Sequence, residues 1–141
     1  MRKFDTKLLV LGRGEFGPHP LAGLFIRIPL DPFRLDGATV KTSVRLDFVR
    51  LPDVRWDALA HQTFQFPQNP EAGFIDGSMY IDGAHHPIDV TKVAFGQVTG
   101  GAIRATFTSV IDFAFEGLGD FVKTPWTFAA LLAWTSEAQT A

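Results

Sequence analysis

The neighbouring histidines His85 and His86 are the residues whose types could most readily do chemistry. Imidazole nitrogens bind metal ions and exchange protons near neutral pH, and carboxylates lie close in the sequence at Asp82 and Asp89. Successive side chains on a strand point to opposite faces, so both rings reach one metal ion only if a turn folds them inward. A glycine follows Asp82 and Pro87 follows the histidines, which is typical of a turn. We interpret the pair as part of a turn, with ligand contact as the alternative and no metal site.

A phenylalanine-lined pocket is the setting in which these side chains could bind a small ligand. The chain has 14 Phe but only 1 Tyr and 3 Trp. Because phenylalanine carries no polar group, its rings favour a core, an apolar cavity or a subunit interface. Ligand pockets are mostly apolar with a few convergent polar groups. The candidates for those polar groups are Tyr80, Asp82, His85 and His86.

The remaining candidate motifs do not predict catalysis. Asp112 and Glu116 are both carboxylates, but four residues along a straight strand separate them by about 13 Å. Paired catalytic carboxylates lie ~5–10 Å apart. Residues 12–17 spell G-x-G-x-x-G, yet the prolines that follow prevent a helix from opening there. We therefore expect no catalytic residues and no cofactor.

Charge and cysteine content exclude several classes of function. The net charge is −2, and the lysines and arginines are scattered singly rather than gathered into a stripe for nucleic acid or membrane. The absence of cysteine excludes disulfides, thiol nucleophiles and thiolate metal sites. The apolar stretch at residues 8–11 is too short for a signal peptide, and no stretch approaches the ~20 apolar residues of a membrane span. We expect a cytoplasmic protein that binds neither nucleic acid nor membrane.

A run of alternating side chains over residues 103–116 indicates the fold class. Its apolar face consists of Ile103, Ala105, Phe107, Ser109, Ile111, Phe113 and Phe115, and polar residues are frequent on the other face. A period of two predicts a strand with one buried and one wetted face. So long a strand cannot stay flat in a domain of this size, so we expect it to bend, bulge or cross between sheets near Ser109.

Turn signals divide the chain into about eight strands, predicted at residues 4–11, 24–30, 40–49, 63–66, 74–81, 88–95, 103–116 and 124–134. Residues 14–20 are predicted as a loop, 55–61 as a helical turn, and Pro29 indicates an edge strand. For 124–134 the alternation favours a strand, with a helix as the alternative. We predict one all-β domain over residues 1–141, an antiparallel two-sheet sandwich or jelly roll. A closed eight-stranded barrel is the alternative, because both use the same alternation.

The function expected from these observations is binding rather than catalysis. We predict a non-catalytic binding or assembly module that acts through protein–protein contacts and forms a homo-oligomer. The abundant phenylalanine and the predicted edge strand are the features that favour an interface. The alternative is a small-ligand binder, or a small hydrolase- or isomerase-type enzyme, with a pocket lined by phenylalanine and open to a small apolar ligand.

Overall fold

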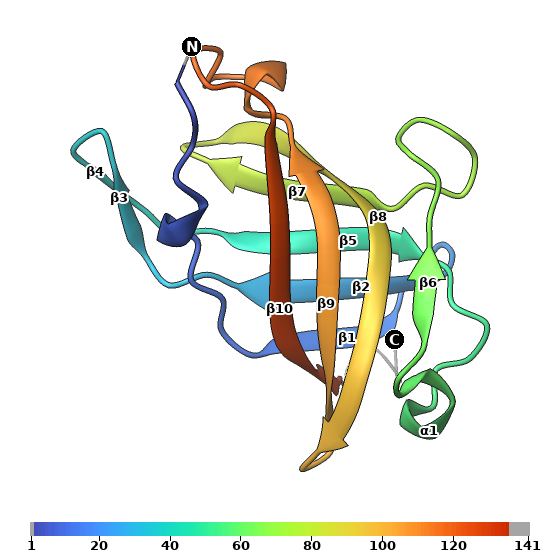
Figure 1. Ribbon diagram of the computed structural model, residues 1–141. Coiled ribbons are helices and arrows are strands. Elements are labelled where there is room, and N and C mark those ends of the chain that lie inside the picture. The colour runs from blue at the N-terminus through green and yellow to red at the C-terminus, as the bar shows by residue number, and fades with distance from the viewer. Residues whose placement is uncertain (1, 136–141) are drawn as a thin grey trace.

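The computed structural model describes residues 2–135, which form an almost entirely β-structure (Figure 1). Its strands are β1 (Gly14–Pro18), β2 (Leu24–Pro29), β3 (Phe33–Leu35), β4 (Ala38–Val40), β5 (Ser43–Val49), β6 (Thr63–Gln65), β7 (Asp76–Ile81), β8 (Ala84–Thr99), β9 (Ala102–Ile111) and β10 (Thr124–Trp134). The helical segments are the short turns η1 (Thr6–Leu8), α1 (Trp56–Leu59) and η2 (Phe113–Phe115). Within residues 2–135, no helix is long and apolar enough to cross a membrane.

Seven strands close into a barrel in the order β1–β2–β5–β7–β8–β9–β10, and β10 returns to β1. Each strand is antiparallel to the one before it. Because the number of strands is odd, the first and last run in the same direction, and β1 pairs with β10 in parallel. In Figure 1, β8, β9 and β10 stand upright at the front, and β7, β5, β2 and β1 lie across behind them. The β6 strand adds to the barrel beside β8, and β3 and β4 form a separate hairpin.

The predicted all-β class is confirmed, but the predicted two-sheet sandwich is wrong. In a sandwich, no strand of one sheet is hydrogen-bonded to a strand of the other. Here β8 pairs with β7 on one side and with β9 on the other, so the strands form one continuous sheet. Register shifts between Val90 and Lys92, and between Phe95 and Val98, bend this 16-residue strand. The alternative of a closed barrel is correct in kind, with seven strands in place of eight.

Large side chains from every wall of the barrel meet in its interior. The inward positions of β8 change from Ile88 and Val90 to Val93 and Phe95 across the first register shift, so the apolar face stays inside. Fully buried residues that contribute to this core include Phe16, Ile26, Ile28, Leu46, Met79, Ile103 and Phe107. Their burial supplies most of the stabilisation of such a fold.

Two-residue turns connect the neighbouring strands β7, β8 and β9. Asp82 and Gly83 join β7 to β8 with φ of 50° and 80°, and Gly100 and Gly101 join β8 to β9 with φ of 57° and 78°. Positive φ at both positions is the geometry of the turn that matches the twist of a hairpin. The predicted turns at Asp82 and at Gly100–Gly101 are thereby confirmed.

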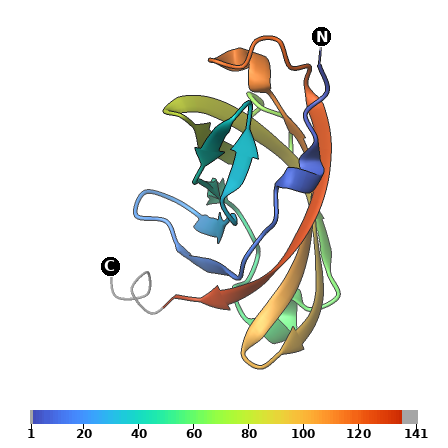
Figure 2. The same ribbon diagram turned by 90° about the vertical axis from the view of Figure 1, so that its left-hand side faces the viewer.

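One end of the barrel is closed by four phenylalanine rings, which we call the aromatic plug: Phe4, Phe33, Phe113 and Phe121. Phe4 stacks on Phe113 with ring centroids 4.3 Å apart, and meets Phe33 and Phe121 edge-on at 6.4 and 5.5 Å. All four rings are buried. Figure 2 shows the N-terminal segment that carries Phe4 running beside β10. The plug therefore joins chain segments from the N-terminus, the β3–β4 hairpin, η2 and the loop that follows it.

A surface arginine ties the same segments together outside the plug. Arg2 donates to Asp36 at 3.0 and 3.1 Å and to Asp120 at 2.7 Å, and its guanidinium lies 4.1 Å from the centroid of the Phe121 ring. These hydrogen bonds raise the pKa of Arg2 and lower the pKa of Asp36 from its ordinary value of 3.8. Because these charged groups are exposed, their ion pairs contribute little to the stability of the fold and mainly orient the segments. The buried rings of the aromatic plug contribute more.

Three predictions near the N-terminus are wrong, and each has a local cause. Residues 4–11 form η1 and irregular chain instead of a strand. The predicted loop contains β1, whose Gly14 allows close packing, since a Cβ there would lie 2.8 Å from a methyl group of Leu132. Pro29 does not mark an edge strand, because it is the last residue of β2, which lies between β1 and β5.

Several other predictions are confirmed, with changed ends. Residues 124–134 form the strand β10 rather than a helix, and α1 lies within the predicted helical turn. The long run ends as a strand at Ile111 and continues as η2, so Phe113 is buried and Phe115, predicted on the apolar face, is exposed. The assignment of residues 1–141 to one domain stays a prediction, since residues 1 and 136–141 lie outside the described part.

Candidate functional site

The structure separates the four predicted ligand-binding residues between two sides of the barrel wall. Tyr80 and His85 are opposite each other on β7 and β8 and point outward. Asp82 lies in the exposed turn between these strands. His86 is opposite the buried Met79 and points inward. The two histidines are therefore not brought together, as the alternation of a strand requires.

His86 is completely buried, and neither ring nitrogen has a hydrogen-bond partner among the described residues. Its ring packs 5.5 Å from that of Phe113, at the inner side of the aromatic plug. Burial lowers the pKa of His86 from its ordinary value of 6.5, and His85 lowers it further, while Glu116, the backbone of Phe113 and Asp112 act in the opposite direction. The histidine is thus held neutral inside the barrel, where it cannot contact a ligand on the outer wall.

Outside the barrel, three aromatic rings form a row across the ends of β7, β8 and η2. Tyr80 stacks on His85 with centroids 5.1 Å apart, and Phe115 meets His85 edge-on at 5.5 Å. The backbone N–H of His85 donates to Glu116 at 3.2 Å, which fixes this end of β8 to the η2 segment. Tyr80 is 54% exposed and Phe115 is 60% exposed. This row is an aromatic surface whose two outer rings, Tyr80 and Phe115, are exposed.

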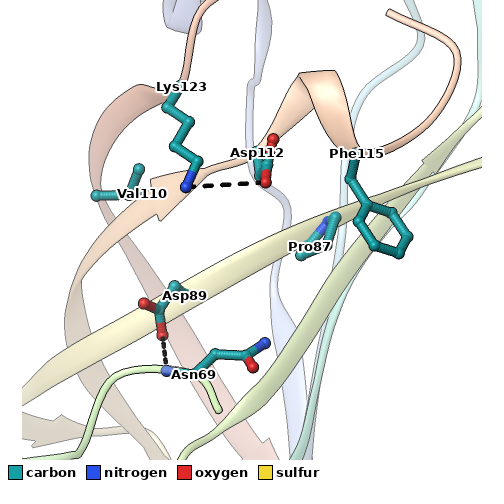
Figure 3. Close-up of a pocket in the computed structure, with 7 residues that line it drawn as sticks. All are labelled: Asn69, Pro87, Asp89, Val110, Asp112, Phe115 and Lys123. Carbon is teal, nitrogen blue, oxygen red and sulfur yellow. Dashed lines mark hydrogen bonds and ion pairs between the residues drawn. The ribbon is translucent and has the colours of Figure 1, made fainter. Parts of the chain in front are cut away.

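A hollow of about 290 Å³ continues from Phe115 along the outer wall (Figure 3). We call it the outer groove. Pro87 and Asp89 on β8, and Val110 on β9, form its floor, because odd positions of β8 and even positions of β9 face outward here. Asn69, Asp112 and Lys123 complete its rim from three different loops. The groove thus depends on the register of β8 against β9, in which Asp89 lies opposite Val110.

The carboxylates of the outer groove are held by backbone amides. Asp89 accepts a hydrogen bond from the backbone N–H of Asn69 at 3.1 Å, and Asp112 accepts one from Ala114 at 3.1 Å (Figure 3 shows the first). Lys123 lies 4.0 Å from Asp112. Within residues 2–135, Asp89 has no ion pair within 4.0 Å. The groove therefore presents a fixed negative charge beside an exposed aromatic ring.

This combination of groups suits a cation. Carboxylates attract cations directly, and the negative face of an aromatic ring attracts them as well. A planar guanidinium fits best, because it can stack on a ring and donate several hydrogen bonds at the same time. Lys123 also lines the groove, but it lies 4.0 Å from Asp112, so the arrangement favours a cation over an anion.

Sequence reasoning did not single out Asn69, Asp89, Phe115 or Lys123 as members of one site. The two carboxylates Asp112 and Glu116 lie on either side of η2. The available signal was the outward alternation of β8 and β9, but the contributions of Asn69 and Lys123 depend on loops. Within the described chain, no group of three or more His, Asp or Glu side chains is arranged to hold a metal ion.

The fold and groove define an all-β barrel protein with an acidic, aromatic surface hollow. Comparison with family models, with curated proteins and with solved structures gives no match for this chain.

Proposed function

We propose that this protein is a non-catalytic binding module that acts through protein–protein contacts. The outer groove is its contact site, and it accepts a cationic side chain, preferably arginine, of a partner protein. The observation that carries this proposal is the Asp89 carboxylate, fixed by the Asn69 amide and without an ion pair in residues 2–135, in a groove that also contains the exposed ring of Phe115. A charge without a counter-ion beside an open ring is an arrangement that a guanidinium completes.

The dimensions of the groove support a side chain in preference to a larger ligand. Pockets for drug-sized molecules have volumes of roughly 300–1,000 Å³ and enclose most of the ligand. The outer groove, at about 290 Å³, lies on an open wall and is bordered by the aromatic row. Such a site gives one anchoring contact within a wider interface, and Tyr80, His85 and Val110 provide neighbouring surface.

The carboxylates of the outer groove are held in place, which supports a role in recognition. Asp89 and Asp112 each accept a hydrogen bond from a backbone amide, which holds their positions. Asp112 also lies 4.0 Å from the cation of Lys123.

The test is calorimetric titration with a short peptide that contains arginine, and with the same peptide carrying citrulline instead. Citrulline keeps the shape of the side chain but has no charge. We expect binding of the arginine peptide, little binding of the citrulline peptide, and weaker binding to the Asp89→Asn variant. Asparagine keeps an oxygen that can accept the Asn69 N–H, so the loop should remain in place.

The matched control is Asp57→Asn, the same change on α1, which lies at the opposite end of the barrel from η2 (Figure 1). Its carboxylate is 78% exposed. Equal binding of the arginine and citrulline peptides, or equal weakening by the Asp57 and Asp89 substitutions, would contradict the proposed function.

A further inference from the structure

A second surface of this protein has the charge that the outer groove lacks. Arg13, Arg27 and Arg104 are exposed on the outer side of the wall formed by β9, β10, β1 and β2. They line two neighbouring hollows of about 290 and 300 Å³, and Arg13 contributes to both. We call this surface the basic face. Within residues 2–135, none of the three arginines makes an ion pair within 4.0 Å.

Small and apolar side chains lie between these arginines. Ala129 and Leu131 on β10 line the hollow that also contains Arg104, and Ala133 lines the other. Leu131 lies opposite Arg104 in the ladder and is 37% exposed. Because alanine side chains project only a short way from the sheet, another protein surface can approach the backbone closely. Glu15, opposite Arg27 in the β1–β2 ladder, also lines one hollow, so the basic face carries three guanidinium groups and one carboxylate around small and apolar side chains. Arginine is enriched at protein interfaces.

The basic face and the outer groove lie too far apart to meet within one molecule. Arg104 is near the start of β9 and Val110 is near its end, so six residues separate them, a distance of about 20 Å along a strand. The intervening strand is part of the closed barrel and cannot fold back on itself. The free arginines of one copy can reach the free carboxylate of the groove only on another copy.

We propose that the partner of the outer groove is a second copy of this chain. An arginine of the basic face of one copy enters the outer groove of the next, with its guanidinium against Asp89 and the ring of Phe115. This inference rests on the proposed function, since it names the source of the arginine. Charge complementarity between the two surfaces is the observation that selects this occupant.

The two surfaces differ, so one contact leaves a free groove on one copy and a free basic face on the other. A reciprocal contact between the same two copies gives a closed two-fold dimer, and otherwise association continues until a ring closes or a filament extends. The attraction is between exposed charges, so it weakens as salt shortens its range from about 10 Å at 0.1 M to 3 Å at 1 M.

Two surface variants test this geometry when they are mixed. Asp89→Asn with Phe115→Ala removes the groove and keeps the basic face, whereas Arg13→Glu with Arg104→Glu does the reverse. All four side chains are at least partly exposed, and we expect both variants to fold. At about 100 µM and low salt, sedimentation velocity should show wild-type species larger than a monomer that decline at high salt, and each variant alone should remain monomeric.

The equimolar mixture of the two variants is the decisive measurement. Each mixed pair retains one intact groove and one intact basic face, so the mixture should form dimers and nothing larger. A monomeric wild-type protein, association of either variant alone, or a mixture that stays monomeric would each overturn the inference.

Titration of the Arg13→Glu, Arg104→Glu variant with the arginine peptide separates the two proposals. This variant keeps the outer groove, and of the basic face only Arg27 remains, opposite Glu15. Peptide binding by a protein whose wild type is monomeric would overturn the inference and leave the proposed function standing. Absence of peptide binding would contradict the proposed function itself, and assembly in that case would have to use another contact.

Discussion

The inner and outer sides of β8 and η2 use the same residue types for different purposes. His86 and Phe113 point inward, where the histidine is buried against the ring and the ring belongs to the aromatic plug. His85 and Phe115, one and two residues away, point outward and form part of the aromatic row beside the outer groove. The difference shows that position in the wall decides whether such a residue contributes to stability or is available for binding.

Neighbouring contacts make this comparison sharper. Phe113 touches Phe4, Phe121 and His86 with centroid distances of 4.3, 5.8 and 5.5 Å, respectively, and has no exposed surface. Phe115 has one ring contact, to His85, and is 60% exposed. Substitutions on the inner side should therefore change the free energy of unfolding, and those on the outer side should change binding.

The largest expected effect is the loss of stability in Phe113→Ala. Removing a fully buried ring leaves a cavity among the plug residues and should lower the free energy of unfolding by about 3–5 kcal/mol. The matched variant Phe115→Ala should change it by less than about 0.5 kcal/mol. Urea unfolding followed by circular dichroism measures both, and similar losses in the two variants would break the comparison.

The second prediction concerns the pH dependence of stability caused by His86. Because the folded protein holds the pKa of His86 below 6.5, the unfolded chain binds the proton first as the pH falls. The stability contributed by neutral His86 should be full above pH 6.5 and decline below it, by at most about 1.4 kcal/mol per pH unit, until the lowered pKa is reached.

Urea unfolding between pH 5 and 8 measures this dependence by difference. The wild-type protein should lose stability relative to His86→Leu as the pH falls, because leucine takes up no proton. Because His85 is one cause of the lowered pKa of His86, His85→Gln should narrow this pH window but keep it, whereas His86→Leu should abolish it. An unchanged slope in His86→Leu would show that other groups control the acid sensitivity.

The third prediction concerns the outer side alone. Asp89→Asn should raise the dissociation constant for the arginine peptide about tenfold, which corresponds to ~1.4 kcal/mol. The free energy of unfolding should remain within about 0.5 kcal/mol of the wild type, since the amide oxygen can replace the acceptor for Asn69. A loss of binding accompanied by an equal loss of stability would indicate that the loop, and not the charge, had been disturbed.

The smallest expected effect is a gain in binding in Lys123→Ala. Lys123 lies 4.0 Å from Asp112 and is 70% exposed, so it partly offsets the negative charge of the outer groove. Its removal should lower the dissociation constant for the arginine peptide about twofold, in keeping with the small energies of exposed ion pairs. The citrulline peptide should show no such gain, and weaker binding of the arginine peptide would mean that Lys123 contributes to the contact.

The long strands were predictable from the sequence because their alternation is local and extends over many residues. β9 and β10 follow it closely, and the turns at Asp82 and Gly100 carry the residues that a two-residue hairpin needs. The choice between sandwich and barrel was not predictable, since it depends on which edges pair. β1 was missed because Gly14 and Pro18 are common in loops, whereas here the glycine provides room for Leu132.

The candidate site was predictable only in part. Tyr80 and His85 were selected from the sequence and do lie beside the outer groove, whereas His86 faces the core. The alternation of β9, extended through residue 115, predicts Phe115 on the inside, but Asp112 caps η2 and accepts the Ala114 N–H. One short helical turn is enough to move Phe115 from the inner to the outer side of the wall. The capping aspartate that starts this turn is a weaker sequence signal than the long alternation before it.

The parallel pairing of β1 with β10 has a consequence for how the chain folds. All other neighbouring strands of the barrel follow one another in the chain, with β3, β4, α1 and β6 as short insertions between them. A growing sheet can therefore add these strands in order. Gly14 and Leu132 must then find each other across almost the whole chain. During synthesis, the outer edge of β1 has no partner until β10 leaves the ribosome. Pairing over so long a separation is slow, so closure of the barrel is expected late in folding. Until then the unpaired edge of β1 is a site at which aggregation can start.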